Sequence, residues 1–394
     1  MIVVEAAGQA LAAAFNMLWE VLWPLALGFI LSAIVQTLVS RTAVARTLGS
    51  DSPRTLATAT LLGAASSSCS YAAVAIARSL FRKGASFPAA IIFEFASTNL
   101  VFELGLVLLI LLGWSFVGAE FAGGLLMVII LALLFRWTLR AALVAEARRQ
   151  SEQGRRGRME GHGEMDMAVT EGPFLRRLFS RRGLTAISHY FWMDVTSVWT
   201  DIGLGLLIAG ALAAWVPTSF WQGFFLTSHP VLSQLWGPLI GPVISLLSFV
   251  CSVGNVPLAA VLWNGGISFG GVVAFIFADL IILPILNIYR KYYGRRMALY
   301  LLVVSYAAMA LAGFLIGFLF QLLGFVPVHH PVVALTTPPA LNYTSVLNVI
   351  FLAIMALLGW QFLRTNGLAM LRMMEAPPVT PADAASDQHH HEPH

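Results

Sequence analysis

The sequence predicts an all-α integral membrane protein built as an inverted repeat of three spans plus one re-entrant helical hairpin, with one extra C-terminal span. Three observations carry this prediction. Of the 394 residues, 58% are hydrophobic and 11% are charged, which is far more apolar than a soluble globular chain. A sequence pattern recurs at an offset of 182 residues, and the 23 Lys and Arg are placed so that its two copies face opposite sides of a bilayer.

Apolar stretches long enough to cross a hydrocarbon core of about 30 Å define the predicted spans. They lie at 17–39, 88–112, 121–139, 195–215, 269–289, 298–320 and 345–363. Two further stretches, 55–80 and 235–262, are apolar but interrupted in the middle. No basic n-region or small-residue cleavage site precedes the first stretch, so we expect a retained span and not a cleaved signal peptide.

The two interrupted stretches are copies of one pattern, each centred on one of the two cysteines. Cys69 and Cys251 are 182 residues apart (251 minus 69), and 11 of the 28 ungapped pairs from Cys69/Cys251 to Ala96/Ala278 are identical. The identities include Cys, Ser, Gly and Phe, which chance alignment of apolar residues does not explain. Self-similarity at a fixed offset therefore indicates a structural repeat.

Basic residues decide how the first copy crosses the membrane. They lie on both sides of it, at Arg54 and at Arg82, so one full crossing would strand a basic cluster outside, against the positive-inside rule. We therefore predict a re-entrant hairpin at 55–80 with its apex at 66–70 and two arms of about 11 residues, each too short to span. The loops that flank 235–262 contain no Lys or Arg, so this hairpin should enter from the outside.

This topology places the N-terminus outside, the C-terminus in the cytoplasm and all 23 Lys and Arg on the cytoplasmic side of an inner membrane. The predicted parts are a first repeat (1–139), an Arg-rich cytoplasmic linker (140–190), a second repeat (191–320), an external loop with the last span (321–366) and a disordered His-rich tail (367–394). Charge bias explains the Arg cluster with fewer assumptions than nucleic-acid binding. We expect the lipid bilayer, and no nucleic acid, as a partner; a homo-oligomer is compatible with the sequence.

An odd number of crossings per copy inverts the second copy, an architecture found in secondary transporters, whose sites lie near the midplane. The two apices then bring thiols, hydroxyls and one amide together: Cys69, Cys251, Ser66, Ser67, Ser68, Ser70, Ser252 and Asn255. A thiolate pair favours soft species such as Cu(I), Zn(II) or trivalent arsenic, so Cys69 and Cys251 are the candidate metal ligands. Two alternatives remain: cysteines that pack as small hydrophobes, and a structural disulfide.

Polar residues inside the spans form a candidate pathway or coupling set: Glu94, Asp279, Ser97, Thr98, Asn99 and Glu103. Ionisable groups at bilayer depth are costly, so a role as proton relay or substrate contact is the default, and neutral hydrogen-bonded carboxyls are the alternative. Glu20, Asp194 and Asp201 lie near span ends, where we expect interfacial positions. The spacing of Gly313 and Gly317 is typical of close helix packing.

At these motifs the chain resembles the ArsP-type predicted permease family, a bacterial group that includes exporters of trivalent organoarsenicals and relatives implicated in metal efflux. The matching strings are S67-S-C-S-Y71, R78-S-L-F-R-K-G84, F95-A-S-T-N-L-V-F-E-L-G105, C251-S-V-G-N-V-P-L258 and A278-D-L-I-I-L-P-I-L-N287. Many members carry Cys-Ser-Cys at the first motif, whereas the stretch from Ser67 to Cys69 keeps one cysteine. The resemblance implies a transporter.

The expected function is a permease that exports a soft metal or a thiophilic metalloid compound, with no cofactor. No phosphate-binding Gly-Lys-Ser/Thr loop, His-Glu-x-x-His motif or placed Ser-His-Asp set indicates an enzyme. One alternative is a permease for a small organic solute with structural cysteines. Another is a membrane scaffold or sensor subunit that works through its Arg-rich linker and His-rich tail.

The topology is tested by cysteine labelling from outside the cell. In a background with both native cysteines changed to Ser, Ser228→Cys should react with a membrane-impermeant maleimide, because its loop is predicted to be external. Ser40→Cys should react only after the membrane is permeabilised. Labelling of both positions in intact cells would overturn the argument from charge.

Overall fold

The computed structural model describes residues 2–38, 47–68, 70–151, 167–169, 173–248, 252–327 and 343–375. Within these residues the chain is helical and contains no strand. Six helices are long and apolar enough to cross a membrane, or seven if one pair bent by 41° counts as a single span. The prediction of an all-helical multi-pass membrane protein is confirmed.

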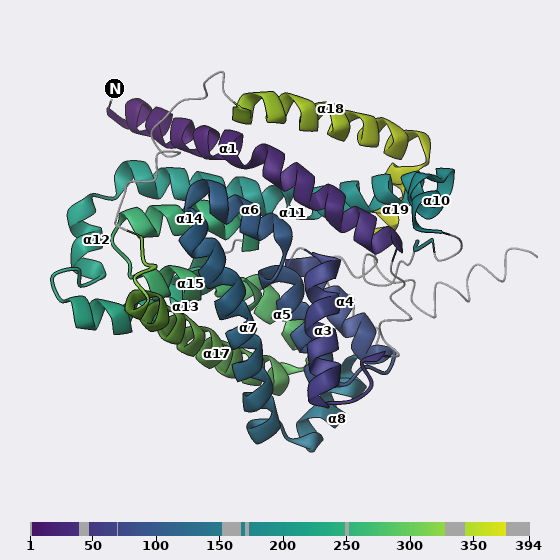
Figure 1. Ribbon diagram of the computed structural model, residues 1–394, viewed down its shortest axis with the longest axis horizontal. Helices are drawn as coiled ribbons and strands as arrows, with labels where there is room; N and C mark the ends of the chain where they lie inside the picture. Colours follow the sequence, from purple (N-terminus) through teal and green to yellow (C-terminus); the bar gives the residue numbers. More distant parts are fainter. Residues whose placement is uncertain are drawn as a thin grey trace, which may run out of the picture.

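The helices follow one another in two similar series (Figure 1). The first contains α1 (Ile2–Leu38), α3 (Pro53–Ser66), α4 (Ser70–Arg82), α5 (Phe87–Asn99), α6 (Phe102–Leu111) and α7 (Trp114–Thr138). The second contains α11 (Arg181–Trp215), α12 (Thr218–Phe224), α13 (Pro230–Ser248), α14 (Ser252–Asn264), α15 (Phe269–Phe277), η1 (Ala278–Ile281), α16 (Leu283–Tyr293) and α17 (Arg295–Leu322). Between them lie α8 (Ala141–Ser151) and α10 (Phe174–Phe179), and α18 (Tyr343–Arg364) and α19 (Gly367–Glu375) follow.

Helix boundaries in the two series recur at the offset seen in the sequence. Adding 182 to the bounds of α4, 70 and 82, gives 252 and 264, which are the bounds of α14. Both α5 and α15 begin after a serine whose hydroxyl accepts a hydrogen bond from a first-turn amide, Ser86 from Ala89 and Ser268 from Gly271. In each series the helix before the apex packs on the helix after the hairpin, α3 on α5 and α13 on α15.

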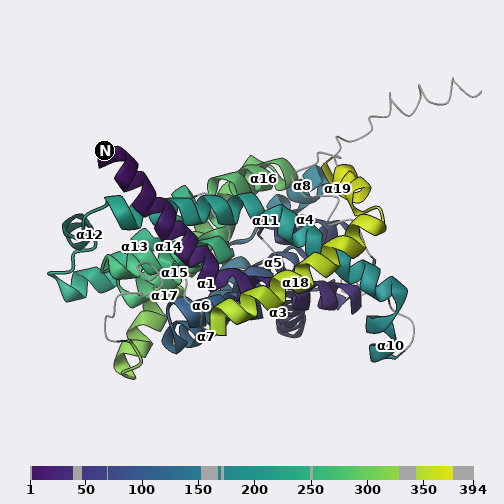
Figure 2. The ribbon, with the colours of Figure 1, turned by 90° about the horizontal axis from the view of Figure 1, so that it is seen from above.

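The two series pack against each other through equivalent helices. α1 lies along α11, and α7 packs on α17. α18 covers α1 from outside, and the two views show these long helices side by side (Figures 1 and 2). The contact is polar near the start of α18, where Trp19 Nε1 donates to Ser345 Oγ (3.1 Å) and the Trp23 amide donates to Asn348 Oδ1 (3.0 Å).

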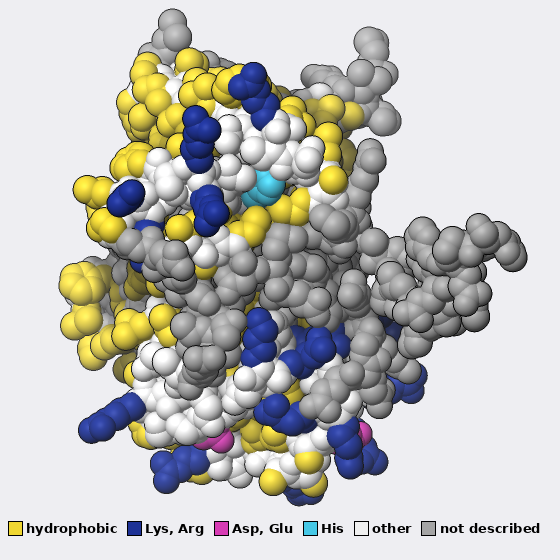
Figure 3. Space-filling view, turned by 90° about the vertical axis from the view of Figure 1, so that its right-hand side faces the viewer, with side chains coloured by type: hydrophobic (Ala, Val, Ile, Leu, Met, Phe, Trp, Pro, Cys, Tyr) yellow, Lys and Arg dark blue, Asp and Glu magenta, His cyan; other side chains and the backbone are white. Residues whose placement is uncertain are grey.

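Basic side chains gather on one face of the molecule. Figure 3, which turns the right-hand side of Figure 1 toward the viewer, shows many Lys and Arg over this face. Arg82, Arg290 and Arg364 lie in the last turns of α4, α16 and α18, and Arg295 and Arg296 open α17. Clustering at helix ends on one face is the pattern that the positive-inside rule describes.

The two ends of the α3–α4 pair lie next to each other. The Ser86 amide donates to the Leu48 carbonyl (2.8 Å), and the Ser86 hydroxyl donates to the Ser50 carbonyl (3.1 Å). α8 closes this end, because the Arg148 guanidinium donates to the carbonyls of Phe81 (2.8 Å) and Ala85 (3.2 Å). The chain therefore enters and leaves this helix pair at one place.

Several boundaries differ from the predictions. Residues 367–375, predicted to be disordered, form α19, and α11 begins at Arg181 behind the N-cap Ser180, inside the predicted linker. α13 has 19 residues and is apolar enough to span by itself, so it is longer than the predicted arm. The predicted stretch 195–215 belongs to α11, whose apolar part among the described residues is Ile202–Trp215. The tail beyond residue 375 and most of the linker lie outside the described residues.

The predicted close packing at Gly313 can be tested by substitution. A Cβ on Gly313 would lie 2.6 Å from both the Gly270 carbonyl oxygen and the Ala274 Cβ. We expect Gly313→Leu to lower the midpoint of thermal unfolding in detergent, since overpacking costs about 1–3 kcal/mol. Gly203→Leu is the matched control, because a Cβ there meets nothing within 4 Å. Equal midpoints for the two variants would contradict the close approach of α15 and α17.

Candidate functional site

The apex of the first hairpin is a buried, irregular segment. α3 ends at Ser66 and α4 begins at Ser70, and Ser67 adopts a positive φ of 36° that is rare for a residue other than glycine. Ser67, Ser68 and Ser70 are all buried, and the Ser68 amide donates to the Ser97 carbonyl of α5 (2.9 Å). The Ser66 hydroxyl donates back to Gly63 (3.0 Å). The apex is thus held by its own half of the chain.

A carboxylate from the second half meets this apex. Asp279, in η1, accepts hydrogen bonds from the Ser70 hydroxyl (2.8 Å) and from Asn99 Nδ2 (3.4 Å). All three side chains are fully buried. Asn99 ends α5, at the polar break predicted for 97–99, and its amide also donates to Thr98 Oγ1 (3.0 Å). Five of the predicted polar positions, including Ser97 through its carbonyl, therefore lie together.

Glu94 lies about one turn before this break, on the same buried helix. Its Oε1 accepts a hydrogen bond from the Tyr289 hydroxyl of α16, so this carboxyl also joins the two halves of the chain. Its other oxygen, Oε2, is buried and has no hydrogen-bond partner in the described chain. Asn99, at the end of the same helix, donates to Asp279, so Glu94 and Asp279 both bond residues at the junction of α5 with the second half. Their predicted joint role stays a prediction.

Glu120 is a buried carboxyl that the sequence analysis missed. It lies in the second turn of α7, and both of its oxygens are buried without a hydrogen-bond partner among the described residues. Gly124, one turn later, packs against Leu100 and Phe277. The predicted span began at residue 121 and therefore left out Glu120. The small residues between Gly118 and Gly124 could have indicated that the packed part of the helix begins earlier.

A second polar cluster holds the other side of the apex. Glu103 of α6 accepts a hydrogen bond from the Ser67 hydroxyl, and Ser32 of α1 donates to the Ser67 carbonyl. Asp194 of α11 accepts from Gln36 Nε2 (2.9 Å) and lies 3.3 Å from the Ser32 hydroxyl. Asp194 is 1% exposed, because α11 lies along α1, which covers it. Its expected interfacial position stays a prediction.

The second apex has a hydrogen-bonded pair of its own. Asn255 Nδ2 donates to Ser245 Oγ (3.1 Å), and Ser248 donates to Asn255 Oδ1 (3.3 Å), which ties α14 to α13. Ser252 is buried at the start of α14. Cys69 and Cys251 lie outside the described residues, so their predicted approach and metal-ligand role stay predictions. Within the described residues no group of three or more His, Cys, Asp and Glu could hold a metal ion.

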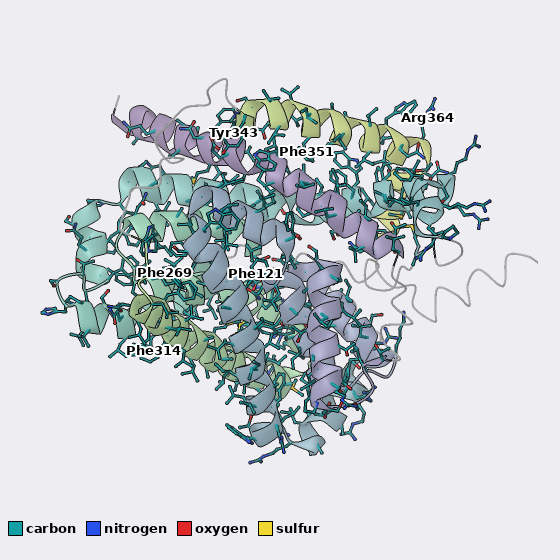
Figure 4. All side chains as sticks on the ribbon, viewed as in Figure 1. Phe121, Phe269, Phe314, Tyr343, Phe351 and Arg364 are labelled. Carbon is teal, nitrogen blue, oxygen red and sulfur yellow. The ribbon has the colours of Figure 1, made fainter. Side chains whose placement is uncertain are left out.

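A cavity of about 710 Å³ opens between α13, the α14–α15 connection and α17. No charged side chain from the described part of the chain lines it. Its polar groups are carboxamides and hydroxyls, and its apolar groups include four aromatic rings: Gln222, Gln234, Asn264, Gln321, Thr227, Ser233, Ser268, Trp263, Phe269, Phe314 and Phe318. Phe269 and Phe314 lie away from the basic side of the molecule, where Arg364 ends α18 (Figure 4). The cavity and the basic face are therefore at different ends.

Comparisons with known proteins agree on one class. The model of a family described as "Predicted permease" matches residues 6–318. The protein named "Putative permease Rv2963" from Mycobacterium tuberculosis is 58% identical over 346 residues, which cover 88% of this chain and 85% of that protein. No solved structure matches the chain.

The buried position of Asp194 yields a stability prediction. Asp194→Ala removes one of the two acceptors of the buried Gln36 amide, of which the other is Ser32 Oγ (3.1 Å), and the loss of a buried hydrogen-bond partner costs about 1–3 kcal/mol. We expect a lower midpoint of thermal unfolding in detergent. Glu146→Ala is the control, because Glu146 pairs with the exposed Arg296, at 3.6 Å, and exposed pairs contribute little. If both variants melted like the wild type, Asp194 would be solvated.

Proposed function

The chain belongs to the predicted permease family, and on that premise we propose that it exports a soft metal or thiophilic metalloid compound across the inner membrane. The cargo site is a midplane site between two re-entrant hairpins, α3–α4 and α13–α14. The family supports a transporter and not an enzyme.

Two observations support the proposed topology. The ends of the α3–α4 pair are hydrogen-bonded to each other through Ser86 and Leu48, as expected of a segment that enters and leaves from one side. The basic face in Figure 3 lies at the helix ends that the sequence assigns to the cytoplasm. With that face inside, α1 starts outside, α18 ends inside, and the uncharged cavity opens toward the outside.

The hydrogen bond between Ser70 and Asp279 carries the proposal. It joins the apex of one half to a buried carboxyl of the other at 2.8 Å, across 209 residues of sequence. Irregular backbone and ionisable groups are tolerated at bilayer depth where they are buried in protein or line a path. Ser70 is the chain neighbour of Cys69, so a cargo held by that thiol would lie beside Asp279.

The residues take the following roles in the proposed mechanism. Cys69 and Cys251 bind the cargo as thiolates, which suit soft ions. Ser66, Ser67, Ser68, Ser252 and Asn255 shape the site. Ionised Asp279 accepts the Ser70 hydrogen bond, and a proton on Asp279 would replace one of its acceptor positions by a donor. Proton arrival at Asp279 or Glu94 would thereby alter the apex, which links cargo release to proton uptake.

The uncharged cavity favours a second candidate, a permease for a small organic solute with structural cysteines. Its volume is within the range of small-molecule pockets, and its carboxamides and aromatic rings suit a neutral cargo. The two candidates differ in what the thiols do. Both candidates use the same two halves, the same buried carboxyls and a basic face turned toward the cytoplasm.

Resistance measurements separate these candidates. Expression in a sensitive bacterial host should raise tolerance to arsenite, methylarsenite, copper or zinc, and Cys69→Ser with Cys251→Ser should abolish the gain, because serine lacks a soft donor. Expression levels are matched by immunoblot. Unchanged tolerance in the double variant would sink the thiol role. Loss only in Glu94→Gln or Asp279→Asn would favour the organic solute.

A further inference from the structure

Glu120 combines full burial with a complete lack of partners. Both carboxyl oxygens are inaccessible and accept no hydrogen bond in the described chain, and neighbouring Glu94 Oε2 and Asn99 Oδ1 share this state. All four atoms are oxygens that need a donor. Buried polar atoms without partners are rare because they are costly, so each indicates an unseen partner or a function. A protonated carboxyl supplies the missing donor itself.

Glu120 lies between the uncharged cavity and Asp279. Phe116, one turn before it on α7, packs its ring 5.1 Å from that of Trp263 and 4.6 Å from that of Phe269, and both of these rings line the cavity. Gly124, one turn after it, touches Leu100 and Phe277, which adjoin Asn99 and η1. Each turn advances about 5.4 Å. The cavity, Glu120 and the Asp279 cluster therefore follow one another along this face of α7.

The charged groups around Glu120 are acidic. Four elements pack on α7: α5 carries Glu94, α6 carries Glu103, α15 leads directly into η1 with Asp279, and α17 carries its basic residues, Arg295 and Arg296, at its start. That start lies at the far end of α7, where Thr138 bonds Tyr300 (2.8 Å). Arg136 is 16 residues from Glu120 (136 minus 120), about 24 Å along the helix. None of the basic residues described on α7 and α17 therefore lies next to Glu120. A bound proton is the positive charge that would neutralise its carboxylate.

We propose that Glu120 relays the coupling proton between the uncharged cavity and Asp279. A proton from cavity water binds one Glu120 oxygen and gives the neutral acid. The acid then donates this proton through intervening water to an ionised oxygen of Asp279, and returns to the carboxylate. One proton moves in each step and no electrons are exchanged. This inference rests on the proposed proton-coupled permease and adds the residue through which the proton reaches its central site.

The test uses the whole protein in liposomes, with methylarsenite as the probe and a pH dye inside. Transport driven by a pH gradient is compared with exchange between equal methylarsenite pools, which requires no net proton movement. Glu120→Gln should lower gradient-driven transport by about a hundredfold, as loss of a proton-transfer group does, while exchange persists. Glu120→Asp, which keeps a carboxyl, should restore part of the gradient-driven rate. Glu146→Gln, on the exposed surface of α8, is the matched control.

Two results would overturn the relay. One is gradient-driven transport by Glu120→Gln at the wild-type rate. The other is loss of exchange together with gradient-driven transport in a variant that elutes and melts normally, which would make Glu120 part of the cargo path.

Failure of the proposed function gives a different result, namely a wild type that moves no methylarsenite. The relay is then judged by modification with a hydrophobic carbodiimide, which attacks protonated carboxyls in apolar surroundings. The Glu120 peptide should gain the reagent mass, and the corresponding peptide of Glu120→Gln should not. An unmodified Glu120 peptide would refute the relay whatever the cargo is.

Discussion

Hydrogen bonds between the serines of one hairpin apex and buried carboxyls are the interaction on which this architecture depends. In the proposed topology the break between α3 and α4 lies at bilayer depth, where hydrocarbon offers nothing to the released polar groups, so protein must supply every partner. Ser67 bonds Glu103, Ser70 bonds Asp279, and the Ser68 amide bonds the Ser97 carbonyl. Without these partners, the break between α3 and α4 would leave several polar groups unsatisfied in an apolar surround.

The partners come from different helices, and this sets how the two halves fit. Glu103 belongs to the same half as the apex, whereas Asp279 belongs to the other half. Ser32 and Asp194 close the network through α1 and α11, the equivalent helices that lie side by side. The apex is therefore bonded to both halves at once, so a shift of one half relative to the other must exchange or break hydrogen bonds at this point.

The sequence predicted the helices well because apolar length and N-cap serines are local properties. Five of the seven predicted spans coincide with helices that can cross a membrane, and a sixth, 269–289, coincides with the bent pair. The paired serines Ser86 and Ser268 begin equivalent helices. The grouping of Glu94 with Asp279 also followed from the repeat offset. The sequence of a segment was sufficient to predict its structure where the composition of that segment alone determines its burial.

Positions that depend on neighbouring helices could not be predicted. Asp194 precedes the apolar part of α11, and its cover by α1 is not indicated by any periodicity in α11. Glu120 precedes the most apolar part of α7, and the packing of Phe116 and Gly124 against other helices shows which way that face turns. The predicted disorder of 367–375 failed for a similar reason: α19 packs on α18, and its Met370 Sδ lies 3.1 Å from His189 Nδ1 of α11.

The carboxyls break the repeat that the helices obey. At the offset of 182, Glu94, Glu103 and Glu120 correspond to Ile276, Ile285 and Leu302, and Asp279 corresponds to Ser97. Two equivalent acidic clusters would double the cost of placing ionisable groups at bilayer depth. A single shared cluster avoids this, because Glu94 and Asp279 each bond a residue of the opposite half, Tyr289 and Ser70. The duplicated helices thus form two similar halves. Acidic residues that occur in only one copy of the repeat place the ionisable groups where those halves meet.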